Sequence, residues 1–341
     1  MEQLNLFWQY VHSLRAESIT YNINLINGAA NGAIHIDSER LAAMSGGITQ
    51  WDFFAYQEDL IKRRNPNGNA ALELKELENK MDNSIRLAFT TELLNLSTNI
   101  WYWIGRDPAI AAKKFNDMLA VQRIEEYLKR SFMMLKATAG SNPLTFRDAT
   151  VAATEDGRAV NYRNLALTAA KFGDQSSQVK TWIMPSGAKT DMLLDNLKNV
   201  AHLFSFNSVN GYQDAEGRTI ITTDDPNLVE IGGVSPDEYF NYWCMGLRPM
   251  AVRITEIDDQ KEAYGTKTGF ENIAETYQAN WSTKFDVYGY KFDAAQLTGD
   301  ANKFVSASDA AIASSANWTQ VTNNHKQTAG VTLKARGRNN Q

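Results

Sequence analysis

Two adjacent carboxylates, Asp224 and Asp225, come nearer to the pattern of an active site than any other residues of this sequence. Paired carboxylates can act as general acid and base or can bind a cation. The same residues stand directly before Pro226, where acidic side chains commonly begin a turn. Adjacent residues of a strand also point to opposite faces of a sheet. We therefore expect a structural turn, and the alternative is a hydrolase that uses Asp224 or Asp225.

The other side chains that could carry chemistry are isolated in the sequence. The single cysteine, Cys244, stands between Trp243 and Met245, and a thiol in such an apolar stretch is expected to be buried and unreactive. None of the histidines lies within one helical turn of another, which argues against a local metal site. They are His12, His35, His202 and His325. Phosphate-binding glycine loops, dinucleotide fingerprints and nucleophile elbows are absent, so we expect no catalytic residue, metal or cofactor.

One basic run, Lys62, Arg63 and Arg64, precedes the turn-rich residues 65–69. Such a run can bind phosphates, but it can equally pair with acidic residues of a partner protein. The chain carries 34 basic and 39 acidic residues, and its net charge of −5 gives no overall attraction to nucleic acid or an anionic membrane. We therefore favour a protein partner for this run, and DNA is the alternative.

Length and composition indicate a globular protein of two domains. The chain has 341 residues, of which 43% are hydrophobic and 11% aromatic, which argues against wholesale disorder. One cysteine cannot form an intrachain disulfide, so the fold needs no oxidising compartment. The N-terminus lacks the features of a secretory signal, and no window approaches the roughly 18 apolar residues of a membrane span. We expect a soluble protein made in a cytoplasm.

The clearest predicted element is a helix over residues 107–137. Asp107 is a good N-cap, Pro108 suits the first helical position, and Gly140 can end the helix. Apolar residues recur in steps of three and four, at Phe115, Met118, Val121, Ile124, Leu128, Phe132 and Leu135. At 1.5 Å per residue such a helix is roughly 45 Å long, so we expect it to act as a strut.

The residues before this helix predict an arm and a loop. Residues 1–16 have apolar side chains at helical spacing, and a short helix at a chain end must dock on its own domain or on a neighbour. Residues 17–50 predict an extended and irregular arm, because residues 27–33 are small and turn-prone. Residues 51–95 are charged and turn-rich, and they predict a projecting loop.

The residues after the helix mix helix and strand signals. Helices are predicted over residues 161–172 and 186–197, and strands over 179–184, 217–223, 239–245, 250–257, 285–292 and 331–333. The signals of both kinds alternate up to about residue 237, and strand signals dominate from there on. The pattern is that of an α+β protein.

The order of these parts resembles the major capsid proteins of tailed bacteriophages, which have the Hong Kong 97-type fold. Several stretches carry the resemblance, and together they cover about residues 50–335. They are Phe172–Asp174, Val179–Ser186, Gly217–Pro226, Phe270–Ile273, Phe285–Tyr290, Asn317–Val321 and Lys326–Val331.

The resemblance implies an α+β fold of five parts. These are an N-terminal arm (1–50), an extended loop (51–95), a peripheral domain with a long spine helix (96–143), an axial domain (144–237), and peripheral-domain strands with a C-terminal segment (238–341). It implies a structural, non-enzymatic subunit that self-assembles into hexamers and pentamers of an icosahedral shell around a double-stranded DNA genome. The protein would be located in the virion capsid after assembly in the host cytoplasm.

The resemblance also implies partners. Leu4, Phe7 and Trp8 would contact a neighbouring subunit, as would Lys62, Arg63 and Arg64 at the tip of the loop. Further partners would be portal, scaffold and decoration or cement proteins, with packaged DNA held non-specifically at the inner face and no membrane. Two alternatives share a structural role: the shell of an encapsulin-like protein compartment, and another virion protein such as a tail-tube subunit.

Overall fold

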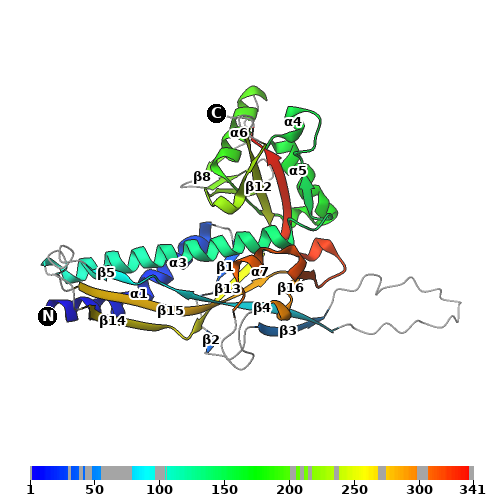
Figure 1. The fold of residues 1–341 in the computed structure, drawn as a ribbon. Coiled ribbons are helices and arrows are strands. Elements are labelled where there is room, and N and C mark those ends of the chain that lie inside the picture. Colours follow the sequence, from blue (N-terminus) through cyan, green and yellow to red (C-terminus); the bar gives the residue numbers. More distant parts are fainter. Residues whose placement is uncertain are drawn as a thin grey trace, which may run out of the picture.

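The computed structural model shows two packed units, a body and an upper unit (Figure 1). In the body, the helices α1 (Glu2–Ala29) and α3 (Pro108–Thr138) lie on one sheet, and the upper unit is a second sheet with its own short helices. The upper unit stands over the C-terminal half of α3. The structure describes residues 2–29, 32–37, 41–42, 48–54, 79–96, 104, 106–199, 205–207, 211–213, 217–233, 238–267, 274–297 and 306–337.

The helix α3 confirms the predicted strut. The Asp107 carboxylate accepts a hydrogen bond from the Ile110 amide (3.1 Å), and Pro108 is the first helical residue. The helix ends at Thr138, and the Gly140 amide donates to the Leu135 carbonyl (3.2 Å). A side chain at Gly140 would collide with the Lys136 carbonyl oxygen, so the glycine is required where the chain leaves the helix.

The helix α1 is longer than predicted, and the irregular arm expected from residue 17 onward is wrong for residues 17–29. Buried side chains continue at helical spacing through Ile19 and Ile23, on the face that packs against α3. The turn-prone Asn27 is used differently: its side chain exchanges two hydrogen bonds with the backbone of Ile36 (2.8 and 2.9 Å). Packing of α1 along α3 and the Asn27–Ile36 hydrogen bonds therefore outweigh the weak helix propensity of Asn27 and Gly28.

The body sheet has the strand order β1-β13-β15-β4-β3, with β14 and β5 also paired to β15 and β2 paired to β13. Its strands are β1 (Ile34–Ile36), β2 (Leu41–Ala42), β3 (Ile48–Phe54), β4 (Asn79–Thr90), β5 (Leu94–Leu96), β13 (Val252–Asp258), β14 (Lys261–Lys267) and β15 (Ala274–Val287). Only β1 and β2 run parallel to their partner β13. One face of the sheet packs against α3, where Ile85 and Phe285 share a core with Ile124 and Tyr127.

Part of the predicted projecting loop is a core strand. Strands β3 and β4 pair antiparallel, from Ile48 opposite Ile85 to Phe54 opposite Asn79. In β4, Ile85 and Leu87 are buried beneath α3. The projecting loop predicted over residues 51–95 is therefore wrong for residues 79–90, which form a strand of the core. Residues 55–78 lie outside the described part of the chain.

The upper sheet has the order β6-β18-β12-β7-β10-β9-β8, and β11 pairs with β12. Its strands are β6 (Phe146–Asp148), β7 (Thr181–Met184), β8 (Ser205–Asn207), β9 (Gly211–Gln213), β10 (Thr219–Thr222), β11 (Val229–Gly232), β12 (Tyr239–Leu247) and β18 (Gly330–Arg336). Its helical segments are α4 (Glu155–Arg158), α5 (Tyr162–Ala169), α6 (Ser186–Asn199) and the 3-10 segments η1 (Ala170–Gln178) and η2 (Pro226–Leu228). The helices and strands predicted between residues 161 and 223 are confirmed.

The domain boundary expected at residue 237 does not follow the sheets. Strand β12 pairs with β7 and β18, so two strands assigned to the peripheral domain complete the upper sheet. Both are central in that sheet, with Cys244 opposite Leu333. The sequence order of the strands could not reveal this, because the pairing joins residues far apart in the chain.

The remaining elements cover the end of the body below the upper unit. They are β16 (Tyr290–Phe292), η3 (Ala294–Gln296), α7 (Asp309–Ala313), η4 (Ser315–Asn317), β17 (Trp318–Gln320) and η5 (His325–Gln327). The single strand predicted over residues 285–292 is split, because Gly289 adopts φ +80° between β15 and β16. No helix in the described ranges is long and apolar enough to cross a membrane.

Candidate assembly surfaces

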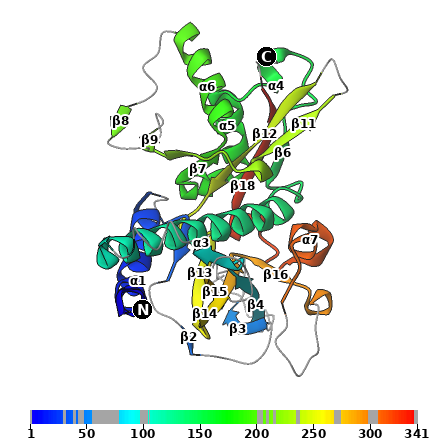
Figure 2. The ribbon, with the colours of Figure 1, turned by 60° about the vertical axis from the view of Figure 1, so that its left-hand side comes forward.

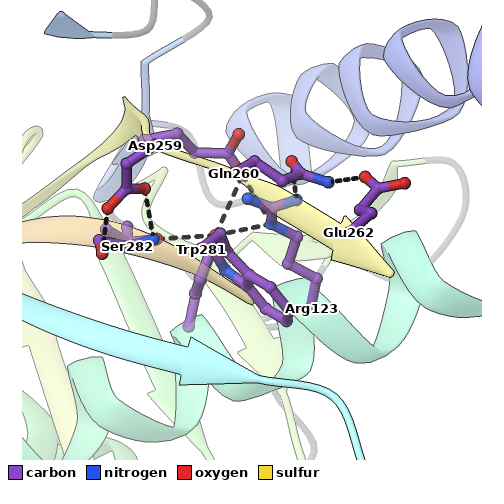
Figure 3. Close-up of polar contacts among 9 residues, drawn as sticks. Arg123, Asp259, Gln260, Glu262, Trp281 and Ser282 are labelled. Carbon is purple, nitrogen blue, oxygen red and sulfur yellow. Dashed lines mark hydrogen bonds and ion pairs between the residues drawn. The ribbon is translucent and has the colours of Figure 1, made fainter. Parts of the chain in front are cut away.

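A network of polar side chains lies inside the body, between α3 and the sheet (Figure 3). The Arg123 Nε lies 2.9 Å from Glu256 Oε1, and Arg123 Nη1 donates to Gln260 Oε1 (3.3 Å). The guanidinium group also lies over the Trp281 ring, 4.5 Å from its centroid. The Tyr127 hydroxyl donates to Glu256 (3.0 Å) and accepts hydrogen bonds from Arg123 and Trp281 (2.8 and 2.9 Å).

The side chains of this network are buried. Arg123 is 8% exposed, Glu256 2% and Tyr127 1%. Burial, together with the negative charge of Glu256, raises the pKa of the Tyr127 hydroxyl well above its usual value, so the group stays protonated. Buried charges are tolerated only when paired and hydrogen-bonded. The arrangement therefore holds α3 at one position along β13 and β15.

Further polar contacts attach α1 to the same region. Arg15 pairs with Glu262 of β14, which also accepts a hydrogen bond from Gln260 (2.5 Å). On the other side, Ser18 donates to the Asp117 carboxylate of α3 (2.8 Å). The two helices and the sheet are thus joined through one connected set of side chains.

Two of the residues expected to contact a neighbour are buried within their own chain. Phe7 and Trp8 are 1% and 4% exposed. The Trp8 ring stacks against Tyr264 and Tyr277 (centroids 5.1 and 5.5 Å), and Phe7 meets Phe115 edge-on (6.0 Å). This apolar face of α1 is therefore used inside the subunit. A contact with a neighbour stays a prediction that would need α1 to be exchanged between copies.

The other predicted contact residues lie outside what the structure describes. Lys62, Arg63 and Arg64 fall in residues 55–78, and the side chain of Leu4 is also outside the described part, although Leu4 belongs to α1. Their contact with a neighbouring subunit stays a prediction.

A charged joint links the end of α3 to the upper sheet. Lys136 of α3 and Lys334 of β18 both pair with Glu230 of β11 (2.7 Å for Lys334). The two ammonium groups lie 4.6 and 5.2 Å from the centroid of the Trp243 ring, and Phe146 stacks on that ring. Burial raises the pKa of Glu230, but hydrogen bonds from the two lysines outweigh it and hold the pKa below its usual value. Residues so far apart in sequence left no local signal of this joint.

The residues proposed for chemistry have structural roles. Asp224 accepts hydrogen bonds from the amide (3.3 Å) and hydroxyl of Ser186, at the start of α6. Asp225 accepts from the Asn227 amide (2.8 Å) and so caps η2, which confirms the predicted turn. Cys244 is fully buried, and burial raises the pKa of its thiol, which stays protonated. In the described ranges, no group of three or more His, Cys, Asp or Glu residues could hold a metal ion.

Comparisons with known proteins identify the family. The model of the Gp13-like family, described as major capsid protein 13-like, matches residues 3–332. A search of curated proteins finds no match. Among solved structures, the capsid of Ralstonia phage GP4 is similar with a TM-score of 0.53 at 8% identity, covering 92% of this chain and 89% of that chain.

Two further structures are similar at lower scores. The capsid of cyanophage Pam1 has a TM-score of 0.47 at 9% identity, with 89% of this chain and 90% of that chain covered. The SrpI encapsulin of Synechococcus elongatus has 0.42 at 9% identity, with 73% and 81% covered. The likeness to the Ralstonia phage capsid shows the fold, a mixed helix and strand fold shared with phage capsids. Because the family model spans both the body and the upper unit, the chain belongs to the major capsid protein 13-like family and is a subunit of a phage capsid shell.

Proposed function

We propose that this shell subunit forms hexamers and pentamers that close into an icosahedral shell around a double-stranded DNA genome, with the Hong Kong 97-type arrangement. The observation that carries the proposal is the family match over residues 3–332. The geometry supports it, because α3 runs from the core around Phe115 to the joint at Lys136 and so braces both units. The subunit would work through contacts alone, as a structural and non-enzymatic protein.

The parts of the subunit would divide this work. The upper unit, completed by β12 and β18, would be the axial domain at the centre of each ring, and the body would be the peripheral domain with α3 as its spine. The extended loop would lie within residues 51–95, with Lys62, Arg63 and Arg64 pairing with acidic groups of an adjacent copy. The antiparallel pair β3 and β4 supports this, because it places Phe54 opposite Asn79.

The partners and location follow from the same proposal. The shell would be assembled in the host cytoplasm and located in the virion, with portal, scaffold and decoration proteins as partners. A net charge of −5 fits a container that must release its DNA, since a strongly basic wall would hold the phosphates. Many weak contacts between copies would sum to a stable shell.

Electron microscopy of the purified chain tests the proposal. We expect closed, rounded shells in negative stain, and nuclease-protected DNA in particles isolated from infected cells. Tubes would favour a tail-tube subunit, and particles filled with a cargo protein would favour an encapsulin-like compartment. A monomer at all concentrations, with or without a scaffold protein, would contradict the proposal.

The N-terminal contact needs a separate test. Deleting residues 1–16 removes Leu4, Phe7 and Trp8, and shells of normal shape and yield would rule out a required contact between copies. Because the deletion also uncovers Tyr277 and Phe115, circular dichroism must show that the truncated subunit is folded. Ser13→Ala, at an exposed position of the same helix, is the control.

A further inference from the structure

Two exposed apolar patches lie on the upper unit, and each carries a charge of a different sign. The first, the hairpin patch, consists of Ile231, Phe240 and Glu238. Ile231 of β11 lies directly opposite Phe240 of β12, and these side chains are 69% and 38% exposed. Glu238, also exposed, stands immediately before β12 and two residues before Phe240, the spacing that shares a face where the chain is extended.

The second, the helix patch, consists of Leu144, Leu167 and Arg163. Leu144 is 55% exposed and Leu167 42%. Lys171 of η1, four residues after Leu167, donates to the Pro143 carbonyl (2.8 Å) and so links the chain just after α5 to the residue before Leu144. Arg163 is exposed and precedes Leu167 by one turn, so it extends the same face.

The patches occupy different margins of the sheet. At this end of the sheet the strands follow the order β6, β18, β12, β11. The helix patch borders β6, and the hairpin patch includes β11. In Figure 2, the β11–β12 hairpin reaches outward at the margin of the upper unit. One subunit therefore presents both patches at once, in separate places.

Rotational symmetry requires such a pair of surfaces. In a closed ring of more than two copies, each subunit contacts its two neighbours through two unlike surfaces. We propose that the hairpin patch of one copy binds the helix patch of the next copy around the ring, with Glu238 facing Arg163. This inference rests on the proposed function, assembly into rings. It assigns the residues that make the contact.

Charge decides between this contact and a symmetric one. Two hairpin patches face to face would bring two Glu238 carboxylates together, and two helix patches would do the same with Arg163. Like charges across an interface are unfavourable, whereas opposite charges fix its register. The apolar side chains would supply the buried area of the contact. The ion pair between Glu238 and Arg163 would set which patch binds which.

A charge exchange tests the pairing. We expect Glu238→Arg alone and Arg163→Glu alone to weaken association roughly tenfold or more, because each brings like charges together. The double variant restores the opposite pair and should recover assembly, as measured by sedimentation velocity and electron microscopy. Lys180→Glu, exposed on the same unit outside both patches, is the matched control. No recovery in the double variant would overturn the pairing.

Cross-linking tests the geometry directly. Ile231→Cys and Leu167→Cys in one chain, treated with a short bismaleimide, should give a ladder of covalent oligomers up to the ring. An equal mixture of the two single variants should give dimers only, and each single variant alone none. The native Cys244 is fully buried and should not react with the maleimide. Dimers from one single variant would show a symmetric contact and overturn the inference.

The same experiments separate this inference from the proposed function. If the unmodified chain forms no rings or shells, assembly itself has failed. If it forms shells while the double cysteine variant gives no ladder, the shells stand and only the assigned contact is wrong.

Discussion

The body and the upper unit are both built from helices on a sheet, but their interiors are stabilised differently. In the body, the ion pair of Arg123 and Glu256 is buried with the Tyr127 hydroxyl between α3 and the sheet. In the upper unit, the cluster beneath α5 and α6 is formed by apolar side chains such as Phe172, Trp182 and Cys244. Among the described residues of that unit, the buried charged side chains are Asp191 and Arg218.

The difference follows from the shapes of the elements. A helix of 31 residues on a broad sheet could shift by one turn and still bury apolar side chains, whereas paired charges satisfy each other at one position only. The short helix α5, of 8 residues, ends at Ala169 and is followed by η1, in which Gly173 adopts φ +54°. The turn of the chain after α5 therefore limits the position of this helix. We infer that the buried pair of Arg123 and Glu256 fixes the register of α3 on the body sheet.

The largest effect is expected where a buried charge loses its partner. Arg123→Met should destabilise the unassembled subunit by roughly 3–5 kcal/mol, because the Glu256 carboxylate would stay buried without its cation. Urea unfolding measures this. Adding Glu256→Gln to the same chain removes the orphaned charge and should recover part of the loss, and a double variant as unstable as the single one would contradict the role of the pair.

In the upper unit, the introduction of a polar group is expected to lower the stability. Cys244→Ser places a hydroxyl in an apolar cluster and should cost about 1–3 kcal/mol. Cys244→Ala removes the sulfur without adding a polar group and is the control. Thermal unfolding should rank serine below alanine. An equal or reversed ranking would show that the apolar cluster around Cys244 tolerates a polar group.

The start of α3 should contribute less. Asp107→Ala removes the cap on the Ile110 amide and should cost roughly 0.5–2 kcal/mol. Asp107→Asn keeps an accepting oxygen and should lose less. Hydrogen exchange at the first turn of α3 reports the effect at the site. Unchanged exchange in the alanine variant would show that the cap contributes nothing.

The joint between the units should show the smallest effect, as a dependence on pH. The pKa of Glu230 is lowered in the folded chain, so its contribution is present above the ordinary glutamate pKa of about 4.3. That contribution is lost as the pH falls through the lower, folded value. We expect Glu230→Gln to flatten the acid side of a plot of melting temperature against pH. The same acid slope in both proteins would exclude Glu230 as its source.

Local patterns predicted the parts whose causes are local. Asp107, Pro108 and the apolar spacing after them located α3. The helix predicted over residues 161–172 begins where the Asn161 side chain caps α5. The turn at Asp225 was likewise predictable, because a carboxylate directly before a proline accepts from an amide two residues further on, here that of Asn227. In each case the deciding contacts are made by a few residues with strong backbone preferences.

The sequence by itself determined the strut, the strands β7, β10, β12 and β18 of the upper unit, and the absence of familiar catalytic motifs. Only the tertiary structure decided that β12 and β18 join the upper sheet, that α1 continues through residue 29, and that Phe7 and Trp8 pack inside their own subunit. It also decided the partners of Arg123 and Lys136. Those outcomes depend on pairings between residues far apart in the chain, and such pairings follow from the packing of whole elements, which no local run of residues encodes.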